Sequence, residues 1–180
     1  MAGTHVALLR GLNLGGSNRL PMKELAALFV DAGCREVVTY IQSGNVVFQA
    51  GDAVAARIPA QIREAIAARY GFQVPIVTRA AAEMAQVVQS NPFLQEGADP
   101  AALHVVFLAE APDAARVESL DPHHSPTDRF ILRGRELYLH CPNGLARTKL
   151  TNDYFDRRLG TISTMRNWRT VLKLHELAGG

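Results

Sequence analysis

The residues with the greatest capacity for chemistry lie in the C-terminal part of the chain. Between Arg147 and His175, seven Lys and Arg stand against two Asp, a local charge of +5. The whole chain carries only +2, so the remainder sums to −3. A basic segment that is also rich in Asn and Thr is typical of a surface that receives an anion. We refer to residues 147–175 as the basic run.

Four residues of the basic run have side chains suited to an anionic ligand. Cations would neutralise its charge and amides would fix its orientation, and the four are Lys149, Asn152, Arg166 and Asn167. Arg166 also stands at i, i+3 and i+7 spacing with Arg169 and Lys173, which predicts a basic stripe on the final helix. The alternative interpretation of that stripe is an ordinary solvated helix face.

A glycine-rich turn, residues 10–19, supplies a second candidate set. It follows an apolar run and precedes a predicted helix, which is where phosphate-cradling loops occur. Arg10 or Arg19 could supply charge and Asn13 an amide, while the glycines would let backbone N–H groups converge on an anion. The turn matches neither phosphate-loop motif, G-x-G-x-x-G or G-x-x-x-x-G-K-[ST]. A flexible connection is therefore the alternative interpretation.

The segment 42–45, Gln-Ser-Gly-Asn, separates two β-rich runs and predicts a hairpin. Ser43 and Asn45 could offer a hydroxyl and an amide to a ligand, or they could serve the turn alone. The segment does not resemble the G-x-S-x-G elbow that activates a serine. The sequence assigns no catalytic residue and no cofactor, and it leaves open whether the chain is an enzyme.

Composition and spacing narrow the classes of partner. The six histidines and two cysteines show no metal-ligand spacing, so no metal site is predicted. No leader or bilayer-length apolar segment is visible, so we expect a soluble, cytoplasmic protein without a membrane partner. The leading hypothesis is a small anionic or phosphorylated ligand bound in a basic, Asn-rich cleft between two repeats. The alternatives are nucleic-acid backbone binding and a protein-interaction module without catalysis. The oligomeric state stays open.

The helices and strands that position these residues follow from the hydrophobic pattern, which predicts a similar order of elements in each half of the chain. The first half is expected to form strand 5–11, helix 21–32, strands 37–41 and 46–48, helix 58–69 and strand 74–77. A connecting helix, 79–88, and a linker, 89–102, follow. The second half is expected to form strand 103–109, helix 113–120, strands 130–132 and 137–139, helix 151–159, strand 161–163 and a last helix, 165–177.

The order β-α-β-β-α-β in each half predicts an α+β fold of tandem ferredoxin-like repeats with antiparallel sheets and an extra C-terminal helix. The expected domains are residues 1–90 and residues 91–180. Several predicted strands are apolar at consecutive positions, such as 103–108. An antiparallel strand with one wet face would alternate instead, so both sheet faces are expected to be covered.

Three motifs, residues 9–16, 40–48 and 148–168, closely resemble the bacterial domain of unknown function (DUF) family 1697. The resemblance extends over nearly the whole chain and implies two ferredoxin-like repeats, in agreement with the element order. It implies no activity and supplies no catalytic residues. The chain departs from the family pattern at Thr148, where Ser is common, and at Met165, where Thr is common.

Overall fold

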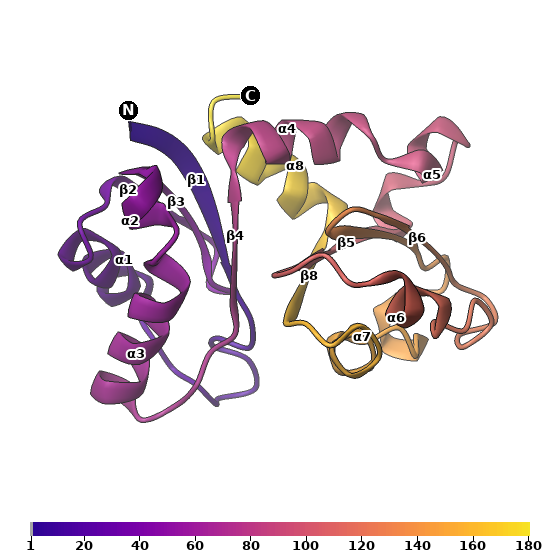
Figure 1. The fold of residues 1–180 in the computed structure, drawn as a ribbon, viewed down its shortest axis with the longest axis horizontal. Helices are drawn as coiled ribbons and strands as arrows, with labels where there is room; N and C mark the ends of the chain where they lie inside the picture. The colour runs from indigo at the N-terminus through magenta and orange to yellow at the C-terminus, as the bar shows by residue number, and fades with distance from the viewer. Residues whose placement is uncertain (1) are drawn as a thin grey trace. The chain divides into compact units, whose positions relative to one another are not determined.

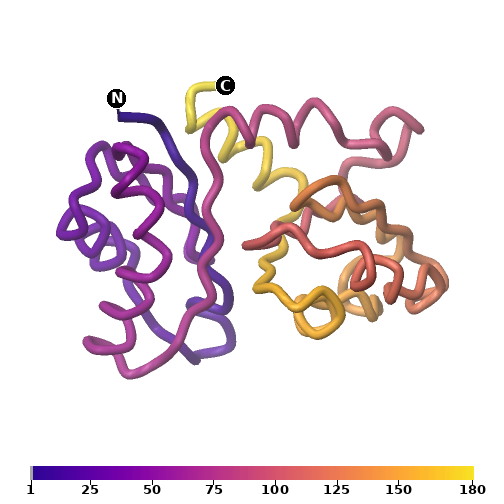
Figure 2. The backbone as a smooth tube through the Cα atoms, viewed as in Figure 1, coloured from indigo at the N-terminus to yellow at the C-terminus, as the bar shows by residue number. Residues whose placement is uncertain are grey.

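The computed structural model describes residues 2–180, which divide into two compact units. Unit 1 contains residues 2–85 together with Lys173–Gly180, and unit 2 contains Gln86–Leu172. In Figure 2, residues 2–85 of unit 1 run from indigo to magenta and its residues 173–180 are yellow, and unit 2 covers the colours between them. This division differs from a boundary at residue 90, because the last residues of the chain pack with the first unit. Each unit has its own sheet and its own layer of helices.

Unit 1 is built on a four-stranded antiparallel sheet of order β2-β3-β1-β4. Helices α1, α2 and α3 cover one face of this sheet (Figure 1). Between sheet and helices lies an apolar core that includes Leu9, Phe48 and Ile62. The elements are β1 (Ala2–Leu9), α1 (Met22–Asp31), β2 (Arg35–Tyr40), β3 (Asn45–Gly51), α2 (Asp52–Ala55), α3 (Ile58–Tyr70) and β4 (Ile76–Ala80).

The helices of unit 1 follow from local sequence signals. In α1 the apolar positions Leu25, Leu28 and Phe29 recur on one face and are buried, as predicted. Helix α3 ends at Gly71, whose φ of 76° is left-handed. A glycine adopts that conformation without the steric cost that a Cβ would bring.

Unit 2 repeats this design with a sheet of order β6-β7-β5-β8, again antiparallel throughout. Tyr154 and Phe155 of α7 pack with Val106 and Leu139 of the sheet in an apolar core. The elements are α5 (Pro92–Gln95), η1 (Pro100–Ala102), β5 (Leu103–Leu108), α6 (Ala114–Glu118), β6 (Arg129–Arg133), β7 (Glu136–His140), η2 (Leu145–Arg147), α7 (Asn152–Leu159) and β8 (Ser163–Asn167). Two further helices, α4 (Ala81–Gln89) and α8 (Trp168–Leu177), contain the boundaries between the units.

Three of the predicted segments differ from the structure. The last strand is β8, Ser163–Asn167, so residues 165–167 extend a strand and do not begin the final helix. Its five residues pair with β5, and this tertiary pairing outweighs the local pattern. The expected linker, 89–102, contains two short helices, α5 and η1, each opened by an Asn or Asp side chain that accepts a backbone N–H. The strand expected at 74–77 lies at Ile76–Ala80.

The two units also share residues at equivalent positions of their sheets. The first strand of each carries His-Val, as His5-Val6 in β1 and as His104-Val105 in β5. In both units the valine pairs with an arginine of the last strand, Val6 with Arg79 and Val105 with Arg166. Both arginines are buried. The repeat is therefore visible at single residues once the strand register is known.

Candidate functional site

The candidate site of unit 1 is a pocket of about 480 Å³ where the loop from β1 to α1 meets the turn between β2 and β3. We call it the loop–hairpin pocket. Its lining combines a guanidinium, two side-chain amides, a glycine and the start of α1: Asn13, Gly16, Arg19, Leu20, Pro21 and Gln42. Seven residues with positive φ lie in these two segments: Gly11, Asn13, Gly15, Gly16, Asn18, Ile41 and Gly44.

Asn13 holds the loop and the turn together. Its Nδ2 donates to the carbonyl oxygens of Leu20 and Gln42, both at 2.9 Å, and its Oδ1 accepts from the Leu20 backbone N–H at 2.9 Å. Its φ of 55° is left-handed, a conformation that Asn tolerates better than most residues. The amide predicted to bind a ligand therefore lines the pocket and braces it.

The turn is fixed against the loop by a close backbone approach at Gly44. The Leu9 backbone N–H donates to the Gly44 carbonyl oxygen at 2.8 Å. A Cβ at position 44 would lie 2.9 Å from Leu9 Cβ and 3.1 Å from Leu12 Cδ1, and φ is +83°. Only glycine fits this position without displacement. Next to it, Ile41 is exposed and has a φ of 50°, which is an outlier for a β-branched residue.

Positive charge enters the pocket through Arg19. Its Nη2 lies 3.8 Å from the place that a Cβ on Gly16 would occupy, so the guanidinium lies beside Gly16. Pro21 caps α1, a helix of ten residues, and the positive end of the helix dipole points into the same region. Arg10 stands at the start of the loop, half-buried, with its backbone N–H donating to the Pro75 carbonyl oxygen.

The two turn residues predicted from the hairpin, Ser43 and Asn45, contact each other. Asn45 is fully buried, and its Nδ2 donates to the Tyr40 carbonyl oxygen and to Ser43 Oγ, both at 3.1 Å. These bonds close the turn between β2 and β3. They serve the fold directly, and they place the neighbouring Gln42 at the edge of the pocket.

In unit 2, Lys149 and Asn152 flank the start of α7. Lys149 has an exposed side chain, and its backbone N–H donates to Ser125 Oγ at 3.2 Å. Asn152 is half-buried, and its Oδ1 accepts from Ser163 Oγ at 3.2 Å. Lys149 is therefore the residue of this pair whose side chain reaches solvent.

Arg166 lies in β8, which corrects the prediction of a basic helical stripe through Arg166, Arg169 and Lys173. It is buried, and its Nη1 donates to Thr164 Oγ1 at 2.8 Å and to the Met165 carbonyl oxygen at 2.9 Å. Burial lowers the pKa of its guanidinium to about 10. Its neighbour Met165 packs against the apolar core of unit 2, so the alternation of the strand places Arg166 on the opposite face of the sheet.

Asn167, the last residue of β8, accepts the Thr170 backbone N–H with its Oδ1 at 2.8 Å. This bond satisfies one of the N–H groups at the start of α8, as an N-terminal cap does. The eight predicted ligand-binding residues thus divide equally between the units. Unit 1 holds Arg10, Asn13, Ser43 and Asn45, and unit 2 holds Lys149, Asn152, Arg166 and Asn167.

Three residues near these sites were absent from the predicted set. Arg19 and Gln42 line the loop–hairpin pocket, and both belong to motifs that the sequence singled out. Arg79 is the buried counterpart of Arg166 and is detectable only through the strand register.

Within residues 2–180, no group of three His, Cys, Asp or Glu side chains could hold a metal ion. Over the same residues, no helix combines the length and apolarity needed to cross a bilayer.

The fold and the pocket define an α+β protein of two four-stranded antiparallel sheets with a cationic pocket at the end of the first. The chain belongs to the family described as "Protein of unknown function (DUF1697)", whose sequence model matches residues 2–138. This match confirms the family resemblance of the first two motifs, and the third lies beyond the matched range.

Among solved structures, the chain is similar to a bacterial protein. It is similar to the conserved bacterial protein SP0830 from Streptococcus pneumoniae, with 20% sequence identity, a TM-score of 0.72 and 99% of each chain covered. A likeness at this identity concerns the fold. No curated protein matches the chain.

Proposed function

We propose that the chain binds a small anionic or phosphorylated ligand in the loop–hairpin pocket of unit 1. One observation carries the proposal: a guanidinium, two amides and a helix N-terminus converge on a single cavity of about 480 Å³. A volume in this range suits a small metabolite. Arg19 would neutralise the anion, and the Gly16 backbone, which has no side chain, would allow close approach.

The conformation of the loop supports the same proposal. A cluster of left-handed residues costs free energy, and such clusters occur at ligand clamps. Asn13 and Gly44 hold this cluster in place through the hydrogen bonds and the close approach described above. A ligand would then meet a pocket that is already shaped, which lowers the cost of binding.

We further infer that each unit is a ferredoxin-like unit. The support is the element order β-α-β-β-α-β, read with α2 and α3 as one helical connection. The strand orders β4-β1-β3-β2 and β8-β5-β7-β6 place the first strand of each unit between the third and the last. Helices on one face of each sheet complete the arrangement.

A thermal-shift titration tests the ligand proposal. Inorganic phosphate and a set of phosphorylated metabolites are titrated at constant ionic strength, and a ligand at ten times its Kd should stabilise the protein by about 1.4 kcal/mol. Arg19→Ala should abolish the shift. Arg63→Ala, an exposed arginine on α3, removes the same charge elsewhere and should leave the shift intact. No shift with any anion, or equal shifts in both variants, would refute the proposal.

A further inference from the structure

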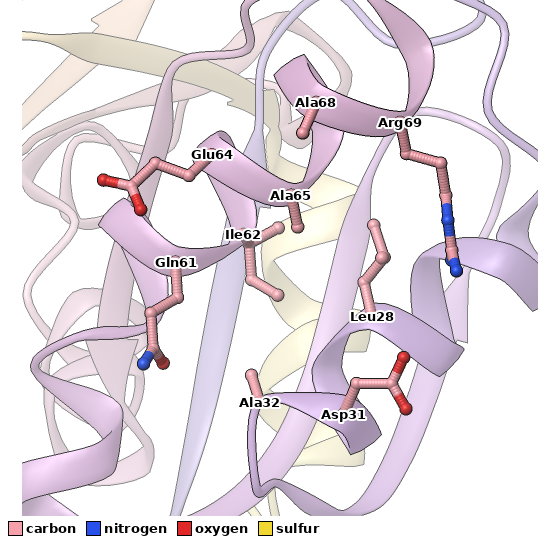
Figure 3. A pocket seen from close by; sticks show the side chains of 9 residues that line it. All are labelled: Leu28, Asp31, Ala32, Gln61, Ile62, Glu64, Ala65, Ala68 and Arg69. Atoms are coloured by element: carbon pink, nitrogen blue, oxygen red, sulfur yellow. The ribbon is translucent and has the colours of Figure 1, made fainter.

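A further cavity of unit 1 is a groove between α1 and α3, on the side of the helices that faces away from the sheet (Figure 3). It measures about 750 Å³. Its floor is formed by Leu28, Ile62 and Ala65, and its rim carries Asp31, Glu64 and Arg69. We call it the α1–α3 groove. It is separate from the loop–hairpin pocket and shares no lining residue with it.

The base of the groove is apolar. The space above this base stays open because the small side chains of α3 do not fill the gap between the two helices. Leu28 is 6% exposed and Ile62 is fully buried, and Figure 3 shows both at the centre of the groove. Ala65 and Ala68 follow along α3, and an alanine is too short to reach the facing helix. An elongated apolar trough at the surface is a common feature of interaction sites.

The width of the groove is fixed at one end. The Tyr70 hydroxyl at the end of α3 donates to the Glu24 carboxylate in the first turn of α1. This hydrogen bond raises the pKa of Tyr70, and Arg69 acts in the opposite direction. Arg69 lowers this pKa by its charge and by a hydrogen bond, so its guanidinium lies beside the Tyr70 hydroxyl at this end of the groove.

The remaining rim charges are acidic. Asp31 and Glu64 are exposed, and within residues 2–180 no hydrogen bond or ion pair holds either carboxylate. Figure 3 places Glu64 on one side of the trough and Asp31 at the end of α1. An apolar floor between two solvated carboxylates is complementary to a partner that is apolar on one face and basic on its flanks.

We propose that the α1–α3 groove docks a basic amphipathic helix of a partner protein. Apolar side chains at i, i+3, i+4 and i+7 of that helix would fill the floor over Leu28, Ile62 and Ala65. Its flanking Lys or Arg would meet Asp31 and Glu64. A second copy of the chain is the less suitable occupant, because two concave faces related by a two-fold axis cannot fill each other.

Fluorescence anisotropy with a labelled peptide tests this proposal on the full chain. The probe is a helical peptide of about 18 residues with Leu at i, i+3, i+4 and i+7 and Lys elsewhere, and its twin carries Glu in place of Lys. The basic peptide should bind, with affinity that falls as salt rises. The acidic twin should not bind.

Three variants locate the binding site. Ala65→Trp fills the floor and should weaken binding at least about tenfold, a loss that corresponds to about 1.4 kcal/mol. The double variant Asp31→Asn with Glu64→Gln should weaken binding and flatten its salt dependence. The matched control, Asp113→Asn with Glu118→Gln, removes the same charge from unit 2 and should bind normally.

Several outcomes would overturn the proposal. They are the absence of binding, equal binding of the acidic twin, and equal weakening in the control variant. A wild-type dimer in sedimentation that Ala65→Trp dissociates would assign the groove to a second copy instead. Melting curves of each variant report folding, and because the charge variants change only exposed side chains they keep the test valid if Ala65→Trp is unstable.

Discussion

Replacing Asn13 should lower the free energy of unfolding by more than is usual for a half-buried loop residue. The side chain is half-buried and makes three hydrogen bonds, two to the loop at Leu20 and one to the turn at Gln42. Its backbone is also left-handed, with a φ of 55°. Asn13→Ala removes all three bonds and places a Cβ-only residue in a conformation that alanine disfavours.

The expected cost has two parts. Each hydrogen bond contributes about 0.5–1.5 kcal/mol net, and the partly exposed setting favours the lower half of that range. An alanine in the left-handed region adds about 1 kcal/mol. Asn13→Ala should therefore lower the free energy of unfolding by about 3 kcal/mol. Asn13→Gly loses the same bonds and accepts the backbone angle, so it should cost about 2 kcal/mol.

Asn13→Asp isolates the donor bonds, because the side chains have the same shape. An aspartate still accepts from the Leu20 N–H, but its second oxygen would face the carbonyl oxygens of Leu20 and Gln42. It should cost nearly as much as alanine. Urea unfolding measures all three variants, with Asn143→Ala, an exposed loop amide, as the control expected to change stability by less than about 0.5 kcal/mol. An Asn13→Asp variant as stable as wild type would refute the reasoning.

Three further substitutions or conditions give measurable outcomes. Gly44→Ala should destabilise by about 2–4 kcal/mol in urea unfolding, because its Cβ would lie 2.9 Å from Leu9 Cβ at a φ of +83°; a change below about 1 kcal/mol would show that the turn can move. Arg166→Ala should destabilise by about 2–4 kcal/mol, whereas Arg166→Met keeps the buried stem packed and should cost clearly less in the same assay. Burial raises the pKa of the Cys34 and Cys141 thiols to about 11, above the value near 9 in the unfolded chain, so their contribution to stability is complete below pH 9 and is lost as pH rises towards 11. Urea midpoints at pH 8 and 10.5 should show a smaller decrease in the Cys34→Ala/Cys141→Ala variant than in wild type.

The elements that could be predicted from sequence are those with a strong local signal. Helix α3 shows an apolar face and a terminal glycine, and both appear in the structure at Ile58–Tyr70 and Gly71. The hairpins likewise form around their glycine turns. Strand β8 could not be read in this way, because Ser163–Asn167 is polar and its strand conformation depends on pairing with β5. Because of this pairing, Arg166 is buried in a strand, whereas the sequence predicted an exposed cation on a helix.

The two segments that line the loop–hairpin pocket could be singled out from the sequence, whereas their meeting at one pocket and the roles of their residues could not be predicted. The glycine-rich turn and the hairpin turn were both singled out, and the structure brings them together at one pocket. Sequence could not show that Asn13 faces the Leu20 and Gln42 carbonyl oxygens, because those contacts depend on how two distant turns meet. For the same reason the sequence could not decide between Arg10 and Arg19 as the cation of the turn, and the structure places Arg19 in the lining of the pocket.

The loop and the turn that form the loop–hairpin pocket carry exposed apolar side chains and strained backbone conformations. Leu14 is 62% exposed and Ile41 is 49% exposed, one in the loop and one in the turn, and both segments contain left-handed residues. Exposed apolar side chains and left-handed backbone conformations both cost free energy, and such strain is typical of functional sites. Hydrogen bonds at Asn13 and Gly44 hold the two segments in these conformations. Because the strain is held by bonds within unit 1, the pocket keeps its shape without a ligand. Binding should therefore leave the loop backbone nearly unchanged, and ligand affinity should follow the charge at Arg19 more closely than the stability of the loop.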